Sequence, residues 1–495
     1  MPECIFALLV FVFILIWFNY LHPLIIYDGD DWWYMSYIRN AFPWGDSFNP
    51  SRIFPETFMA LPAGFAAHVL TPITNDYIGS IKTAYAFTAA VFITAYMILF
   101  MRLIKRRLFI GHTATVVTSF VFLMYHFGIF KKWDSNNQYM FSTENVTCFF
   151  FYTMCNIIAC IAVFCFATYN INDKFGGKIS KERFSGFNWL KNGVLLLLIY
   201  LCTFSNLFAS VIFATFVGVD MVFSIVSSIR KRESFKQIVK KNIYSLLVVI
   251  LWLICLYYEA GGGRANSFTQ PEEFRSSVEK ILDLLNWQNQ LIAISCVVFT
   301  VTAVCIFLFK KKKSHEDHSF IHIVLVLAGS CFMTAVFLVL LGTRTGVGYL
   351  GRADAIYGLP FYGLLISAFS LAYVLKNTKR AAVLLPLFLY FVFVQMTMGT
   401  HMYKENIRDN LSPEKATAVD HYIVNSVVDA VREGKTEMVL RVPRGDRSTW
   451  DNWPHPEYMG ANLAITLRKH GIIDSDITIN IEPDESLNEE FDLPY

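Results

Sequence analysis

Charged residues are scarce in this chain: they make up 16% of its 495 residues, where soluble proteins carry about a quarter. Hydrophobic residues reach 55% and gather in runs that are too long for a soluble core. The composition therefore excludes an intrinsically disordered chain and argues against a soluble globular enzyme. It favours a polytopic membrane protein.

Metal-binding cysteine patterns are also missing. The chain has 10 cysteines, and none has the CxxC or Cys/His spacing of a zinc site. Most of them lie inside apolar runs, as Cys155 and Cys160 do. We interpret them as small buried hydrophobic residues.

A strongly basic surface is lacking as well, since the net charge is only +3. Residues 401–495 hold 10 Lys and Arg against 18 Asp and Glu, a balance of −8, whereas the first 400 residues hold 32 against 21, a balance of +11. We therefore expect a transmembrane domain over residues 1–400, a second domain over residues 401–495, and no nucleic-acid partner.

About eleven apolar runs are long enough to cross a bilayer as helices, which takes about 20 residues each. The fold class expected is an α-helical polytopic membrane protein with a small C-terminal extracytoplasmic α/β domain. The runs lie near residues 4–26, 78–103, 108–128, 146–168, 190–205, 207–229, 243–258, 289–309, 319–341, 357–375 and 381–399.

Alternate connections between these runs are basic and hold 22 of the 32 Lys and Arg residues of the first part. Basic connections face the cytoplasm in membrane proteins. The pattern predicts a plasma or inner membrane protein with a cytoplasmic N-terminus and an extracytoplasmic C-terminal domain. The first run has no basic residue before it, so we expect a retained anchor and not a cleaved signal peptide.

The C-terminal segment has the pattern of a small α/β unit. A helix is expected from Ser412 to Gly434, a strand over 437–442, a second helix over 458–470 and a second strand over 476–481. The connection 441–457 is rich in Arg and Trp. It is suited either to stacking against a sugar or to packing as an ordinary loop.

The first outward connection carries three carboxylates in four positions, in the run Asp28-Gly29-Asp30-Asp31-Trp32. Acids so close together repel one another, so their clustering suggests a metal, a basic group or a proton to be taken. The alternative is that they only mark the end of the first span, with aromatic residues at the membrane surface.

Arginines accompany glycines in two other outward connections. The segment 342–354 contains Arg344, Tyr349 and Arg352 among four glycines, and Arg264 follows three glycines. Glycine lets a ligand approach the backbone, and guanidinium groups bind phosphate with two donors. We treat these three arginines, Arg52, Tyr349 and Trp32 as substrate-binding candidates; the arginines could equally snorkel at the membrane surface.

Two more features sit in or beside the membrane part. Asp220 falls in the middle of an apolar run, where an acid is costly. We interpret it as a helix-packing residue, because a proton-coupled transporter would need several such acids. The stretch 272–287 is amphipathic and is expected to lie on the membrane or to form a solvated linker helix.

This layout, together with Asp28-Gly29-Asp30-Asp31-Trp32, resembles the C-type glycosyltransferase (GT-C) superfamily over about residues 1–400. The resemblance implies transfer of a sugar from a polyprenyl-phosphate donor to a cell-surface or lipid-linked glycan, on the extracytoplasmic side. It places Asp30 or Asp31 in the role of the essential acid, with Asp28 beside it.

The residue types suit that chemistry. A carboxylate takes the proton from the acceptor hydroxyl as it attacks the anomeric carbon, and Arg344 or Arg352 stabilises the departing phosphate. Asp28 and Asp30 form a D-x-D triplet that could bind Mg²⁺ or Mn²⁺. We expect no obligatory metal, because arginines can neutralise a monophosphate.

Two alternatives remain open. A polysaccharide polymerase or ligase would also have about eleven spans and outward arginines, although its large outer element usually lies between late spans. A transporter or a membrane scaffold is the non-enzymatic alternative.

Overall fold

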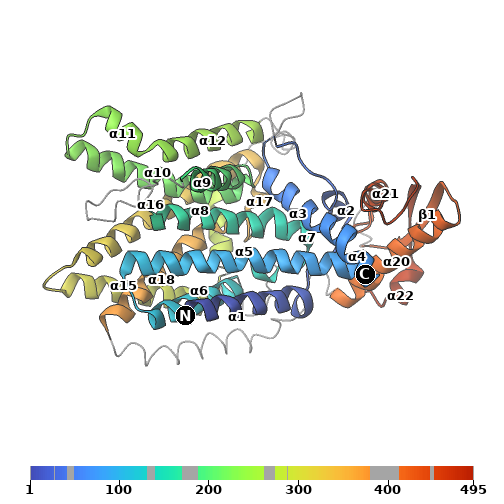
Figure 1. The fold of residues 1–495 in the computed structure, drawn as a ribbon, viewed down its shortest axis with the longest axis horizontal. Helices are drawn as coiled ribbons and strands as arrows, with labels where there is room; N and C mark the ends of the chain where they lie inside the picture. Colours follow the sequence, from blue (N-terminus) through green and yellow to red (C-terminus); the bar gives the residue numbers. More distant parts are fainter. Residues whose placement is uncertain are drawn as a thin grey trace.

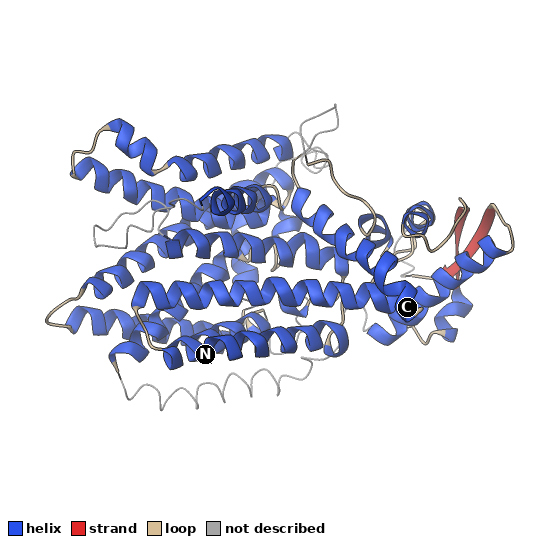
Figure 2. Cartoon of the chain, viewed as in Figure 1, coloured by secondary structure: helices blue, strands red, loops and turns tan. Residues whose placement is uncertain are grey.

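The part of the chain that the structure, a computed structural model, describes is built mainly of helices, and two strands in it lie side by side at one end of the molecule (Figure 2). The structure describes residues 2–26, 28–41, 50–130, 140–169, 188–260, 274–286, 288–378, 412–445 and 451–493.

Eight helical stretches in these ranges are long and apolar enough to cross a membrane, or nine if α11 (Phe235–Lys241) and α12 (Ile243–Ala260), bent by 68° at their junction, form one span. The chain is thus an α-helical protein with several candidate membrane helices, as predicted. The eight comprise α1 (Pro2–Ile16) with η1 (Trp17–Leu21), α3 (Ile53–Phe65) with η2 (Ala66–Leu70) and α4 (Thr71–Thr74), α5 (Tyr77–Leu108), α7 (Val146–Cys148) with η4 (Phe149–Met154) and α8 (Cys155–Tyr169), α10 (Leu207–Arg230), α15 (Gln290–Phe309), α16 (His315–Thr345) and α18 (Gly358–Asn377).

Every predicted span that falls within the described residues coincides with a helix. Two of these helices, α6 (His112–Gly128) and α9 (Asn188–Thr203), are shorter than the others. The predicted span 381–399 lies outside the described residues.

The stretch Ile53–Thr74 was not predicted as a helix. Its three prolines argue against a helix on simple pattern grounds. However, Pro55 lies in the first turn of α3 and Pro72 in the first turn of α4, where the missing N–H costs little. Pro62 lies inside α3 and is followed by η2, a wider π-helical turn. The connection after the first span therefore contains a second long apolar helix.

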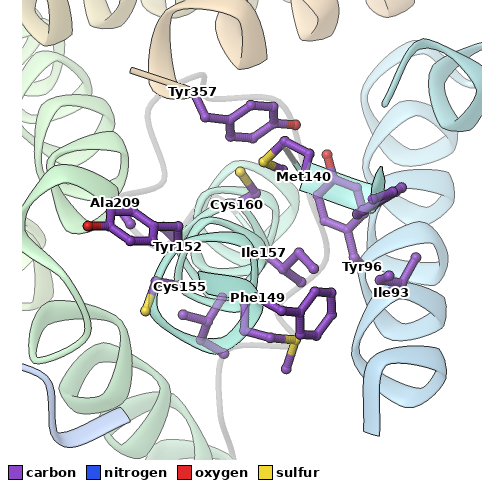
Figure 3. Close-up of a cluster of buried hydrophobic side chains, with 14 of the residues drawn as sticks. Ile93, Tyr96, Met140, Phe149, Tyr152, Cys155, Ile157, Cys160, Ala209 and Tyr357 are labelled. Atoms are coloured by element: carbon purple, nitrogen blue, oxygen red, sulfur yellow. The ribbon is translucent and has the colours of Figure 1, made fainter. Parts of the chain in front are cut away.

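Helix α8 and the turns before it form the centre of the bundle. In the most apolar stretch of this segment, 94% of the residues are buried. Figure 3 shows Tyr96 of α5 and Ala209 of α10 on opposite sides of this central helix. Cys155 and Cys160 are fully buried in it, as predicted, and all 10 cysteines are free.

Three basic connections within the described residues, which follow α5, α10 and α15, lie at the end of the bundle opposite to the strands (Figure 1). There, Lys105 Nζ lies 2.7 Å from Glu3 Oε1 at the start of α1, and Lys310 Nζ lies 2.8 Å from Asp317 Oδ1 at the start of α16. The side of the membrane on which these basic ends lie stays a prediction.

Asp220 lies close enough to Arg107 of α5 for their charges to interact. Arg107 also donates from Nε to the carbonyl of Ala167 over 2.7 Å. The acid in the apolar run therefore has a cation within range of its charge, and its interpretation as a packing residue stays a prediction.

The C-terminal unit, residues 412–493, follows the predicted order of helix, strand, helix and strand. Its elements are α20 (Pro413–Arg432), β1 (Glu437–Pro443), α21 (Met459–Lys469), β2 (Thr478–Asp484) and α22 (Glu485–Glu490). Strands β1 and β2 pair in parallel, with Leu440 opposite Ile481, because α21 carries the chain back across the sheet.

Candidate functional site

Helix α2 (Gly29–Tyr34) carries the acidic cluster and begins with a capping box. Asp28 Oδ1 accepts a hydrogen bond of 3.0 Å from the N–H of Asp30, and Asp31 Oδ2 accepts one of 3.1 Å from the N–H of Asp28. Such reciprocal bonds satisfy N–H groups that a helix start leaves unpaired. Two of the three acids thus start the helix.

The same two carboxylates also bind the segment that leads into α7. Asn145 Nδ2 donates to Asp28 Oδ2 over 2.9 Å, and the N–H of Thr147 donates to Asp31 Oδ1 over 3.0 Å. Both carboxylates are buried. Burial, and then the charges of Asp31 and Asp30, raise the pKa of Asp28 well above its ordinary value of 3.8, against the opposing effect of Asn145.

Asp30 differs from its neighbours because it is exposed to solvent. Burial, and then the charges of Asp30 and Asp28, raise the pKa of Tyr458, which lies just before α21, above its ordinary value of 10. Among the three acids, Asp30 is therefore the one that an approaching molecule can reach.

Gly29 gives the turn before α21 room to approach α2. A Cβ on Gly29 would lie 2.9 Å from Pro456 Cγ and 3.1 Å from Tyr458 Cε2. The N–H of Gly29 donates to the carbonyl of Pro454 over 3.1 Å, and Asn462 Nδ2 donates to the carbonyl of Gly29 over 3.2 Å. This turn belongs to the predicted sugar-binding connection 441–457, of which residues 446–450 lie outside the described residues.

Further along α21, two more side chains bond to backbone carbonyls of α2 and of the residue that ends it. Thr466 donates to the carbonyl of Trp32, and His470 Nε2 lies 3.2 Å from the carbonyl oxygen of Met35. Burial lowers the pKa of His470 to about 4 despite the Met35 bond. His470 is thus neutral at physiological pH, with Nε2 donating to Met35 and Nδ1 accepting from the hydroxyl of Tyr77 over 2.7 Å.

The residues of this contact are spaced by four along the chain: Tyr458, Asn462, Thr466 and His470. A spacing of four places side chains on one face of a helix. We call this row the polar stripe of α21. It joins the C-terminal unit to the acidic helix, and the two helices lie next to each other in Figure 1.

Arg352, one of the predicted phosphate ligands, pairs with an acid of its own segment. Its Nε and Nη2 donate to the two carboxylate oxygens of Asp354 over 3.1 and 2.9 Å, and its guanidinium stands 4.0 Å from the ring centre of Tyr152. The charges of both Arg352 and Asp28 reach the Cys148 thiol.

A lysine that was not predicted joins Arg352. Lys280, on α14 (Phe274–Asn286), reaches Gly351, where a Cβ would lie 3.0 Å from Lys280 Cε and 3.8 Å from Nζ. The predicted amphipathic stretch thus forms a helix that brings a cation to the predicted arginine loop. The sequence could have indicated this role, because Lys280 is a basic residue at the polar edge of the amphipathic stretch.

Helix α14 also covers an apolar groove of about 600 Å³. Its walls come from α14, α15, α16 and α18, and Gln288 is the polar residue among them. In a chain with membrane-spanning helices, such a groove suits a hydrocarbon chain. The residues that give it this character include Val278, Ile281, Leu285, Phe332, Val336 and Leu364.

The remaining predicted residues are more dispersed. Arg344 is exposed in the last turn of α16, and Tyr349 stacks on Phe208 with ring centres 6.0 Å apart. Trp32 is buried, with 1% exposure, so its ring packs in the core. Arg264 lies outside the described residues.

Arg52 belongs to a network of ion pairs that the sequence did not reveal. Glu56, which is fully buried, accepts two bonds of 2.6 and 2.8 Å from Arg39. Arg52 lies 3.9 Å from the same carboxylate and 4.0 Å from Glu259 of α12. Two arginines face two glutamates here, so the group has no net charge. Such a group is better suited to holding segments of the protein together than to binding phosphate.

The D-x-D triplet does not present a chelating pair. Both oxygens of Asp28 accept bonds from N–H groups, whereas Asp30 is exposed to solvent. Within the described ranges, no group of three or more His, Cys, Asp or Glu residues is arranged to hold a metal ion.

Comparison with known proteins found no matching family model, curated protein or solved structure.

Proposed function

We propose that this chain is a membrane glycosyltransferase that moves a sugar from a polyprenyl-phosphate donor to a cell-surface or lipid-linked glycan. The observation that carries the proposal is the position of Asp30. It is the exposed acid of a cluster whose other two members are buried and bonded.

In this mechanism, the carboxylate of Asp30 takes the proton of an acceptor hydroxyl. The hydroxyl oxygen attacks the anomeric carbon, and the bond from that carbon to the phosphate oxygen breaks. The lipid phosphate leaves with the bonding electrons, and the configuration of the sugar inverts. Asp28 and Asp31 hold the helix that carries the base.

Cations near the groove would stabilise the departing phosphate. The guanidinium of Arg352 has five N–H donors, and its pairing with Asp354 uses two of them. Lys280 adds a second positive charge beside Gly351. The apolar groove under α14 would hold the polyprenyl chain.

The topology follows from the charges. Because the basic connections meet at one end of the bundle and basic ends face the cytoplasm, the C-terminal unit and Asp30 lie on the extracytoplasmic side of a plasma or inner membrane. The finer architecture, about eleven spans with an extracytoplasmic α/β domain, belongs to the same proposal.

Binding of polyprenyl phosphate tests this function without knowledge of the sugar. The protein in lipid nanodiscs should retain the labelled lipid, and Arg352→Gln and Lys280→Gln should each weaken binding about tenfold or more, since each removes a charge-assisted contact. Lys435→Gln is the matched control, because Lys435 is exposed on the C-terminal unit and pairs with Glu433. Equal retention in all four proteins would reject the proposed donor site.

The same experiment separates the alternatives. A scaffold would not retain polyprenyl phosphate above the level of empty nanodiscs. A polymerase or ligase would retain it but would act on lipid-linked chains of many sugars, which glycan analysis of a deletion strain would reveal.

A further inference from the structure

Helix α11 (Phe235–Lys241) is a short amphipathic helix at the end of the bundle opposite to the strands (Figure 1). Phe235, Ile238 and Val239 are spaced by three and four residues, so they share one face of the helix. Lys236 and Lys240 lie on the other side. Phe235 is 81% exposed, and both lysines are exposed. The helix thus presents an apolar ring and two cations to its surroundings.

Both ends of α11 are fixed. At its start, Ser234 and Gln237 form a capping box, which satisfies N–H groups that a helix start leaves unpaired. At its end, the N–H and Nδ2 of Asn242 both donate to the carbonyl of Ile238, over 3.2 and 2.8 Å. Asn242 is buried, and the next residue begins α12. The corner between the two helices is therefore held by hydrogen bonds.

The direction of α11 follows from its neighbours. Helix α12 packs along α10, where Trp252 Nε1 donates to Ser210 Oγ over 3.2 Å, and α10 is long and apolar enough to cross a membrane. The axes of α11 and α12 meet at 68°. A helix turned so far from a membrane-spanning neighbour lies closer to the plane of the bilayer than to its normal. Because α11 also follows the end of α10, it lies at a surface of the bilayer.

The charges around α11 are mostly of one sign. Residues 230–241 contain a single acid, Glu233, whose Oε2 lies 3.4 Å from Lys241 Nζ. The other cations of this stretch are exposed: Arg230, Lys231, Arg232, Lys236 and Lys240. Such a surface complements a layer of negative charge, and anionic lipid head groups form such a layer at the surface of a membrane.

We propose that α11 is an interfacial helix that binds an anionic lipid surface. Phe235 enters the boundary of the acyl chains, and Lys236 and Lys240 bind lipid phosphate groups, as amphipathic helices with basic residues on the polar face do. The partner is the bilayer, because α10 and α12 carry α11 to its surface. The proposal does not rest on the sugar transfer proposed above, and it holds for either orientation of the chain in the membrane.

A nitroxide label at position 235 tests where α11 lies. The full-length protein, with the exposed Cys4 and Cys305 replaced by Ser, carries the label on Phe235→Cys in nanodiscs of phosphatidylcholine and phosphatidylglycerol. Molecular oxygen concentrates in the bilayer and a neutral nickel chelate in water, so the ratio of the spin relaxation that they cause measures depth. This ratio should be about threefold or more higher than for a label on Gln237→Cys, which lies on the opposite face and leaves the Ser234 cap in place. An equal or lower ratio at position 235 would overturn the proposal.

The contact with head groups is tested with the same label. Lys236→Gln combined with Lys240→Gln should lower the ratio at position 235 about twofold or more, and so should nanodiscs of phosphatidylcholine alone, since in each case one partner of the charge contact is gone. Lys311→Gln combined with Lys312→Gln is the matched control, because it removes two exposed cations after α15 at the same end of the bundle, and it should leave the ratio unchanged. A constant ratio in the first variant, or an equal fall in the control, would overturn the proposal.

Discussion

Asn145 holds Asp28 through a hydrogen bond of 2.9 Å from Nδ2 to Oδ2, and its Oδ1 accepts the N–H of Cys148 over 2.7 Å. One amide thus connects the start of α2 with the start of α7. This amide therefore fixes the acidic cluster relative to the first turn of α7.

Replacing Asn145 should weaken the fold. Asn145→Ala leaves one oxygen of the buried Asp28 without its donor, which costs about 1–3 kcal/mol. The thermal unfolding midpoint in detergent should fall accordingly. Asn286→Ala, at an exposed position at the end of α14, is the control and should unfold at the wild-type temperature. Equal midpoints for the two variants would contradict this role of Asn145.

Substitution of the acids of α2 should have two different effects, one on activity and one on stability. Asp30→Asn should lower sugar transfer by about 10²–10⁴-fold without changing the unfolding midpoint, because Asp30 is exposed. Asp31→Asn should lower the midpoint, because the buried Asp31 carboxylate accepts the N–H groups of Asp28 and Thr147. Transfer rates and unfolding curves of both variants check this. Full activity in Asp30→Asn would remove the proposed base.

The raised pKa of Asp28 predicts a particular dependence of stability on pH. The folded state binds the proton of Asp28 more tightly than the unfolded state, whose pKa is near 3.8. The contribution of this proton to the free energy of unfolding is complete below that pH. It is lost as the pH rises toward the pKa of Asp28 in the folded state. Wild type should therefore lose stability relative to Asp28→Asn between pH 4 and pH 7, measured as the change in the difference of unfolding midpoints. A difference that stays constant over this range would contradict the assigned shift.

The two arginines of the segment 342–354 should respond differently to lysine. Arg352 uses a planar two-donor contact with Asp354, which a lysine cannot reproduce. Arg352→Lys should therefore weaken the binding of polyprenyl phosphate. Arg344 is exposed at the end of α16, so Arg344→Lys should bind as wild type does. Equal affinity in both variants would remove Arg352 from the donor site.

The topology can be tested by labelling in whole cells or spheroplasts. In a background with the exposed Cys4 and Cys305 replaced by Ser, a cysteine at the exposed Ser475 should react with an impermeant thiol reagent. A cysteine at Arg232, exposed at the basic end, should react only after lysis. The reverse pattern would place the C-terminal unit in the cytoplasm.

Hydropathy was sufficient to locate the long apolar helices α5, α6, α8, α9, α10, α12, α15, α16 and α18, because each needs a long apolar run whatever it packs against. It failed at Ile53–Thr74, where prolines interrupt the pattern but occupy positions that a helix tolerates. The C-terminal elements were predicted from local signals, such as the cap at Ser412 and the glycines Gly434 and Gly471, which adopt positive φ values of 76° and 67°.

The site was predicted less completely. The clustering of Asp28, Asp30 and Asp31 was visible in the sequence, but the spacing of Asp28 and Asp31 also matches a capping box, and only the contacts of the folded chain separate the exposed acid from the two that start the helix. The polar stripe of α21 has a readable spacing of four. Its partner lies more than 400 residues earlier in the chain, and no local pattern connects Asn462 with Gly29.

Most bonds from the polar stripe end on the main chain of α2. Asn462, Thr466 and His470 bond to the carbonyl oxygens of Gly29, Trp32 and Met35. A carbonyl oxygen is present whatever side chain the residue carries. Apart from Gly29, where a Cβ would lie 2.9 Å from Pro456 Cγ, a substitution in α2 therefore leaves these three acceptors in place. Substitution of a stripe residue removes its bond.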